Sequence, residues 1–177
     1  MATTWKLDPA HSELTFKVKH LVITTVTGYF RSFDGTIVTE DESDFTTGKV
    51  DFTIDTASID TNQAQRDEHL KSADFFDAEK HPRITFTSTA IETKSEREFL
   101  LHGDLTVGET TKPMKLDVEL GGTVTDPYGN FKVGFEVSGN MSRKEFGLTW
   151  SAVTEAGAVV VSDEVKILAS VQFIKQA

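Results

Sequence analysis

Hydrophobic and polar residues alternate along most of this chain. A period of two residues is typical of a strand that buries one face. The first such stretch, residues 12–20, places four side chains on the buried side: Leu14, Phe16, Val18 and His20. The pattern recurs and predicts eight strands, at residues 12–20, 26–38, 50–54, 84–90, 99–107, 114–120, 133–141 and 165–173.

Eight strands joined mostly by short links indicate an all-β fold and favour an antiparallel barrel, because closing a sheet on itself removes its exposed edges. The second stretch changes parity near Arg31 and Ser32, and a bulge there would bend the strand as barrel closure requires. A sandwich of two sheets shows the same alternation, so periodicity alone leaves both architectures open. Residues 142–162 are predicted to form a long loop before the last strand.

The period changes after the third strand, where one short helix is predicted. Good helix formers without Gly or Pro fill residues 62–72, and the hydroxyl of Ser58 or Thr61 can cap the helix start. Pro82 disfavours helical geometry at the residue before it, so the next strand can begin directly afterwards. We expect this segment to cover one mouth or edge of the barrel, with three side chains pointing inward: Leu70, Phe75 and Phe76.

Length and composition indicate one soluble domain over residues 1–177. A chain of 177 residues is long enough for one substantial core and short for two. The net charge of −10 disfavours nucleic acid and acidic lipid surfaces, which attract Lys and Arg. The chain has no Cys and no apolar run of about 18 to 20 residues that could span a membrane. Because no apolar leader stands at its start, we expect a cytoplasmic protein.

Thirteen phenylalanines against two tyrosines and two tryptophans suggest a broad apolar interior, since Phe carries no polar group. An eight-stranded barrel can be filled by its own side chains or can hold one slender ligand. Gly28, Gly103 and Gly139 fall on inward positions and would leave room, although glycine also marks barrel bends. A packed core and a hollow interior therefore both stay open.

Each polar candidate near this interior has a structural alternative. His20 is either a buried, hydrogen-bonded residue or a ligand contact. Arg66 and His69 either form a solvated helix face or meet a polar head group, and Arg143 either pairs with a carboxylate or binds an anionic group. The five histidines lack the H-x-H or H-x-x-x-H spacing of a metal site, and no G-x-S-x-G elbow supports a nucleophilic hydrolase.

Seven motifs follow one another along the chain: W-x-L-D-P-A-H-S (5–12), F-x-V-x-H (16–20), G-x-F (28–30), R-D-E-H-L-K-S-A-D-F-F-D (66–77), P-R-I-T-F (82–86), G-D-L-T-V (103–107) and S-R-K-E-F-G-L (142–148). Their order and spacing resemble the YceI-like family of polyisoprenoid-binding proteins over almost the full chain. The resemblance implies an eight-stranded antiparallel, lipocalin-like barrel with a helical insertion near residues 62–72. It also implies a homodimer and an elongated interior that holds a long-chain amphiphile, such as a polyisoprenoid, a quinone, or a fatty amide or acid. Many members of that family are periplasmic.

The residues expected to bind ligand combine these motifs with the inward positions: Phe16, Val18, His20, Phe30, Phe33, Arg66, His69, Leu70, Phe75, Phe76, Phe86, Met141 and Phe146. We expect a non-enzymatic carrier or sequestering protein without a cofactor, because each buried CH₂ group contributes about 0.8 kcal/mol and a long chain needs few specific contacts. Two alternatives stay open. One is an enzyme acting on a lipid or a small substrate with His20 or His69 as base, and the other is a dry-cored stress or interaction protein.

Overall fold

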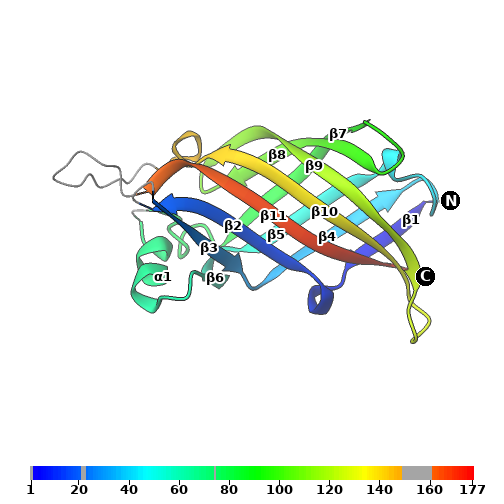
Figure 1. The fold of residues 1–177 in the computed structure, drawn as a ribbon, viewed down its shortest axis with the longest axis horizontal. Helices are drawn as coiled ribbons and strands as arrows, with labels where there is room; N and C mark the ends of the chain where they lie inside the picture. Colours follow the sequence, from blue (N-terminus) through cyan, green and yellow to red (C-terminus); the bar gives the residue numbers. More distant parts are fainter. Residues whose placement is uncertain (1, 21–22, 74, 149–160) are drawn as a thin grey trace.

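The computed structural model describes residues 2–20, 23–73, 75–148 and 161–177, and these residues form an antiparallel β-barrel (Figure 1). The strands are β1 (Thr3–Leu7), β2 (Glu13–His20), β3 (Thr24–Phe30), β4 (Phe33–Thr39), β5 (Lys49–Asp55), β6 (Ile59–Asp60), β7 (Arg83–Thr93), β8 (Glu98–Val107), β9 (Thr110–Thr125), β10 (Phe131–Ser142) and β11 (Val161–Lys175). Eight of the described strands close a ring in the order β1-β4-β5-β7-β8-β9-β10-β11, and β11 returns to β1. The predicted eight-stranded barrel is therefore confirmed.

Three strands of the ring, β1, β4 and β5, are each continued along the barrel wall by a second strand, β2, β3 and β6 respectively. β1 and β2 both pair with β11, and the 3-10 helix η1 (Pro9–His11) separates them. β3 and β4 are separated by Arg31 and Ser32, so the single strand with a bulge predicted for residues 26–38 is two strands with different partners. β5 and β6 are linked by the 3-10 helix η3 (Thr56–Ser58). The bent wall thus extends beyond the closed ring through β2, β3 and β6, toward the left of Figure 1.

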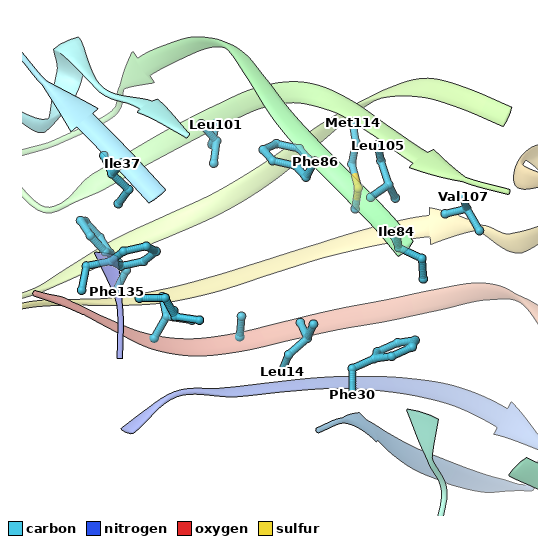
Figure 2. Packing of buried hydrophobic residues seen from close by; sticks show 14 of the residues in the cluster. Leu14, Phe30, Ile37, Ile84, Phe86, Leu101, Leu105, Val107, Met114 and Phe135 are labelled. Atoms are coloured by element: carbon cyan, nitrogen blue, oxygen red, sulfur yellow. The ribbon is translucent and has the colours of Figure 1, made fainter. Parts of the chain in front are cut away.

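The alternating pattern does not predict β1, because Trp5 and Leu7 are its two apolar residues and two positions make no period. The strand nevertheless buries Trp5 completely and leaves Leu7 only 6 % exposed. Elsewhere the pattern is reliable: five successive inward positions of β8 are all buried, namely Phe99, Leu101, Gly103, Leu105 and Val107. In Figure 2, Leu14 and Phe30 point from one wall toward Phe86, Leu105 and Met114 on the opposite wall.

The helix α1 (Ala64–Lys71) lies within the predicted range, at the end of the barrel opposite the two termini (Figure 1). Its residue before the first turn is Gln63, which makes no side-chain cap, so the predicted cap by Ser58 or Thr61 is wrong. Asn62 has φ of 66° and turns the chain between Thr61 and the helix. The three side chains expected to point inward, Leu70, Phe75 and Phe76, are partly buried and pack against the core.

β10 ends at Ser142 and is followed directly by the 3-10 helix η4 (Arg143–Phe146). The expected loop over residues 142–162 therefore begins with an ordered turn, and its residues 149–160 lie outside the described residues. In the described part of the chain, no helix has the length and apolar character needed to cross a membrane.

Candidate functional site

The barrel contains an apolar cavity of about 160 Å³. The described residues that line it carry only aliphatic, methionine and phenylalanine side chains. All strands of the ring except β1 contribute to it: Ile37, Phe52, Phe86, Leu105, Met114, Phe135 and Phe173 are examples. An apolar cavity of roughly 150 Å³ stays free of water and can accept a small apolar molecule. The geometry therefore favours hydrocarbon as the occupant.

The end of the cavity nearest the two termini is formed by a cluster of aromatic rings around Trp5, which we call the aromatic floor. The Trp5 ring lies 5.3 Å from that of Phe45 and 5.8 Å from that of Phe131, and Phe45 meets Phe135 edge-on at 5.4 Å. The indole Nε1 donates to Thr39 Oγ1 at 3.2 Å. Trp5 has no exposed surface, so its ring is packed on all sides at this end.

A second row of aromatic rings fills the barrel near α1. Phe16 lies 5.5 Å from Phe30, and Phe30 meets Phe76 edge-on at 6.0 Å. Phe76 belongs to the segment between β6 and β7, which contributes no strand to the wall. At the helix end, side chains of an inserted segment therefore pack against rings of the sheet.

All three inward glycines lie against neighbouring side chains: Gly28 and Gly103 face phenylalanine rings, and Gly139 faces Leu116, whose Cδ2 would lie 2.6 Å from a Cβ atom there. A Cβ atom on Gly28 would lie 2.2 Å from Cζ of Phe16, its partner across β2 and β3. A Cβ atom on Gly103 would lie 2.3 Å from Cζ of Phe86. The missing side chains let these rings lie against the wall, and this placement leaves the axis of the barrel less crowded.

Comparison with known proteins identifies the family. A family model for the YceI-like domain matches residues 5–173. The chain belongs to the YceI-like family. Protein YceI of Escherichia coli O157:H7 is 39 % identical over 178 residues, which cover 99 % of this chain and 89 % of that protein.

Two solved structures share this YceI-like fold. Burkholderia cenocepacia BcnA superposes with a TM-score of 0.81 at 22 % identity, covering 94 % of this chain and 98 % of that one. A polyisoprenoid binding domain from Saccharophagus degradans, implicated in plant cell wall breakdown, superposes with a TM-score of 0.70 at 14 % identity, covering 97 % and 98 %. At such identities, both likenesses concern the fold alone.

Most of the residues predicted from the YceI-like motifs lie toward the helix end, beside the cavity and not in its lining. Among them Phe86 lines the cavity, while Phe30 and Phe146 are buried in the core around it. The partly buried ones packed against that core are Phe16, Phe33, Leu70, Phe75, Phe76 and Met141. Val18 is half-buried on β2, and His20 ends that strand with its side chain outside the described part of the structure. Their contact with a ligand stays a prediction.

The polar residues of the helix motif have structural partners. Arg66 donates from Nε to Thr61 Oγ1 at 2.7 Å and from a terminal nitrogen to the Thr61 carbonyl at 2.5 Å. Asp67 accepts from the Thr61 backbone N at 2.8 Å. His69 meets the ring of Phe75 edge-on at 5.1 Å. Arg66 and Asp67 thus tie α1 to the end of β6, a structural role that differs from the solvated helix face given as the alternative.

Arg143 also has a structural partner. It is 3 % exposed, and its Nη1 donates to the Leu148 carbonyl at 2.6 Å, which holds the turn after β10. Burial lowers the pKa of Arg143 from its ordinary value, and the charge of Asp163 opposes that shift. Asp163 itself accepts from Ser142 Oγ at 2.5 Å.

The first motif of the YceI-like pattern fastens the break between β1 and β2. Asp8 Oδ2 lies 2.7 Å from Lys132 Nζ and 2.8 Å from His11 Nδ1. Ser12 Oγ donates to the Asp8 carbonyl at 2.7 Å and accepts from the Gln172 backbone N at 3.0 Å. The hydrogen bond from Lys132 holds the pKa of Asp8 below its ordinary value. Ser12 is engaged in backbone contacts, so this group does not form a nucleophilic triad.

Sequence reasoning missed most of the cavity lining. Leu101, Leu105 and Phe173 stand on predicted inward positions, so alternation marked them as buried without marking them as a site. Phe45 follows the charged run at residues 40–44 and belongs to the 3-10 helix η2 (Phe45–Thr47). No period signals its burial, because it reaches the barrel interior from a link between strands.

Proposed function

We propose that this protein binds a long-chain amphiphile inside its barrel and acts as a non-enzymatic carrier or sequestering protein. A polyisoprenoid, a quinone, or a fatty amide or acid would supply the chain. The observation that carries the proposal is the cavity, whose described lining residues are all apolar. Membership of the YceI-like family and the polyisoprenoid binding of the Saccharophagus degradans neighbour support it.

The energetics favour a long apolar chain over a small polar ligand. Each CH₂ group removed from water contributes about 0.8 kcal/mol, so affinity grows with chain length. The cavity of about 160 Å³ is smaller than the roughly 300–1,000 Å³ of common ligand pockets, so a long chain needs additional space. We expect that space to come from the row of Phe16, Phe30 and Phe76, because Phe76 lies on the inserted segment and can move without breaking the sheet.

The direct test is to purify the natively folded protein, extract it with organic solvent and analyse the extract by mass spectrometry beside a denatured control. We expect a stoichiometric isoprenoid, quinone or fatty-acyl species in the native sample. An empty extract, followed by no uptake of added lipid, would contradict the proposal and favour a dry-cored interaction protein.

A pair of variants locates the ligand. Ala169 on β11 lines the cavity, whereas Ala90 on β7 is exposed on the outer surface. Ala169→Phe should fill the cavity and lower the amount of extracted lipid, and Ala90→Phe should leave it unchanged. Equal lipid content in both variants would place the ligand elsewhere.

A further inference from the structure

Thr56 carries an unusual hydroxyl group. Among the described residues, two buried side-chain polar atoms have no hydrogen-bond partner, Thr56 Oγ1 and His102 Nε2. His102 Nε2 still lies 3.5 Å from Glu92 Oε2, so a carboxylate is close to it. Thr56 is only 1 % exposed, and no ion pair or hydrogen bond engages its side chain in the described part of the chain. A buried hydroxyl without a partner destabilises the fold, so it requires an explanation.

The other two buried threonines satisfy their hydroxyl groups. Thr39 Oγ1 accepts from Trp5 Nε1 at 3.2 Å and donates to the Asp41 carbonyl at 2.5 Å. Thr61 Oγ1 donates to Asp67 and accepts from Arg66. Thr39 and Thr56 are equally buried, at 1 % exposure each, and they differ in whether their hydroxyl has a protein partner. Thr39 is therefore a matched control for Thr56.

The position of Thr56 relates it to the cavity. Val50, Phe52 and Ile54 are the inward residues of β5, and all three line the cavity. β5 ends at Asp55, whose backbone is still extended, and Thr56 begins η3; Thr56 is buried between two exposed neighbours, Asp55 and Ala57. Its backbone N donates to the Pro82 carbonyl at 3.0 Å, where β5 leaves β7. Thr56 is thus a buried residue two positions after Ile54, at the helix end of β5 and outside the residues that line the cavity.

We propose that the Thr56 hydroxyl anchors the head group of the bound chain by a hydrogen bond to an uncharged oxygen, such as a hydroxyl or a carbonyl. This inference rests on the proposed lipid-binding function and specifies the head group. A neutral head fits because a buried carboxylate or phosphate would need a counter-charge, and the described residues that line the adjoining cavity carry no charged side chain. The nearby charges of Arg66 and Asp67 are engaged with Thr61.

Three C20 compounds of one branched skeleton test the proposal: phytol with a hydroxyl, phytanic acid with a carboxylate, and phytane without a head group. The protein is incubated with equal amounts of all three at neutral pH, re-isolated, extracted and analysed by mass spectrometry. The wild-type protein should enrich phytol over phytane about five- to tenfold, the ratio expected for one hydrogen bond. Phytanic acid should not exceed phytane.

Three variants separate the hydroxyl from the rest of the site. Thr56→Val should remove the preference for phytol while still loading phytane, and Thr56→Ser should keep the preference. Thr39→Val should also keep it. Thr56→Val should unfold at no lower temperature than the wild type, since it replaces a hydroxyl without a protein partner by a methyl group, whereas Thr39→Val should lose stability because Trp5 Nε1 loses its acceptor.

The outcomes are distinguishable. If the wild-type protein takes up none of the three compounds, the proposed function fails. If it takes up phytol and phytane equally, or if Thr56→Val keeps the enrichment, lipid binding stands and the role of Thr56 is overturned. Preferential uptake of phytanic acid would also overturn it, because a charged head would then have to find its partner elsewhere.

Discussion

At the end that carries the two termini, the barrel wall is continuous, whereas at the helix end the sheet divides. β5 stays paired with β7 as far as Asp55 opposite Arg83, and the chain then turns to β6, which pairs with β3. The segment between β6 and β7 closes the remaining gap with Phe76 and its neighbours. The first end is a fixed floor, and the second is the place where a chain can enter without breaking strand pairing.

The two ends also differ in how firmly their closing elements are held. The aromatic floor is centred on Trp5, which is fully buried within the sheet. By contrast, α1 has no buried residue, and the non-glycine residues with positive φ in the described chain, Asn62 at 66° and Asp77 at 48°, lie on either side of it. A non-glycine residue with positive φ costs conformational free energy. Poorly buried segments also open locally at a lower free-energy cost than core strands. We therefore expect the inserted segment to open before the floor does.

The largest effect is expected from removing the centre of the floor. Trp5→Ala leaves a large void and deprives Thr39 of its donor, so it should lower the free energy of unfolding by about 3–5 kcal/mol, as measured by urea denaturation. Tyr128→Ala is a suitable control, because Tyr128 is 89 % exposed in the turn between β9 and β10. A loss for Trp5→Ala no larger than that of the control would show that the floor does not stabilise the barrel.

A smaller loss is expected at the helix end from Gly28→Ala. The new Cβ atom would overlap the Phe16 ring, and overpacking of this kind costs about 1–3 kcal/mol. In a Phe16→Ala background the overlap disappears, so the same glycine substitution should cost much less. Equal costs in both backgrounds would indicate that the backbone at Gly28, and not the ring, is the constraint.

Alanine substitutions at two half-buried phenylalanines, one at each end of the barrel, test at which end lipid enters. Phe76→Ala and Phe131→Ala should each lower stability by about 1–2 kcal/mol, less than a fully buried phenylalanine would. We expect Phe76→Ala to take up added lipid faster, because it removes a ring that packs against Phe30 at the helix end. Phe131→Ala should leave the uptake rate unchanged, as followed by time-resolved extraction and mass spectrometry. Faster uptake in Phe131→Ala instead would move the entrance to the floor.

The same comparison explains how far the sequence could predict the molecule. The strands follow from alternation, because a half-buried strand needs apolar residues at every second position, and β8 obeys this at five positions in succession. Alternation does not detect β1, because two apolar residues, one of them Trp5, make no period. The short helix follows from the loss of period two, but its cap does not, since the positive φ of Asn62 removes Thr61 from capping geometry.

The site was harder to predict than the fold. A sequence motif can contain residues that serve the fold as well as residues that bind a ligand. The motif of the inserted segment includes Arg66 and Asp67, which hold α1 to Thr61. A cavity, however, depends on which side chains meet across strands. The fit of the Phe16 ring against Gly28 follows from the pairing of β2 with β3, and that register cannot be obtained from either strand alone.

The smallest effect concerns the ionic contact that fastens β1 to β2 near the floor. Lys132 Nζ lies 2.7 Å from Asp8 Oδ2, 3.6 Å from Asp126 Oδ2 and 3.4 Å from Gln172 Oε1, and His11 also contacts Asp8. Asp8→Asn keeps a side-chain oxygen for the turn of η1 and removes the charge. At neutral pH we expect the variant to unfold a few degrees below the wild type in a thermal scan.

The pH dependence gives this last prediction its sign. Lys132 holds the pKa of Asp8 below its ordinary value in the folded protein. The stabilisation is therefore complete above the unfolded-state pKa of about 3.9 and is lost as the pH falls through the lower folded-state pKa. The difference in melting temperature between wild type and Asp8→Asn should stay constant from about pH 5 to 8 and shrink below about pH 4. A difference that persists unchanged into acid would mean that Asp8 acts through its turn hydrogen bond, which asparagine keeps, and through packing, and that the ionic contact contributes nothing to holding the floor.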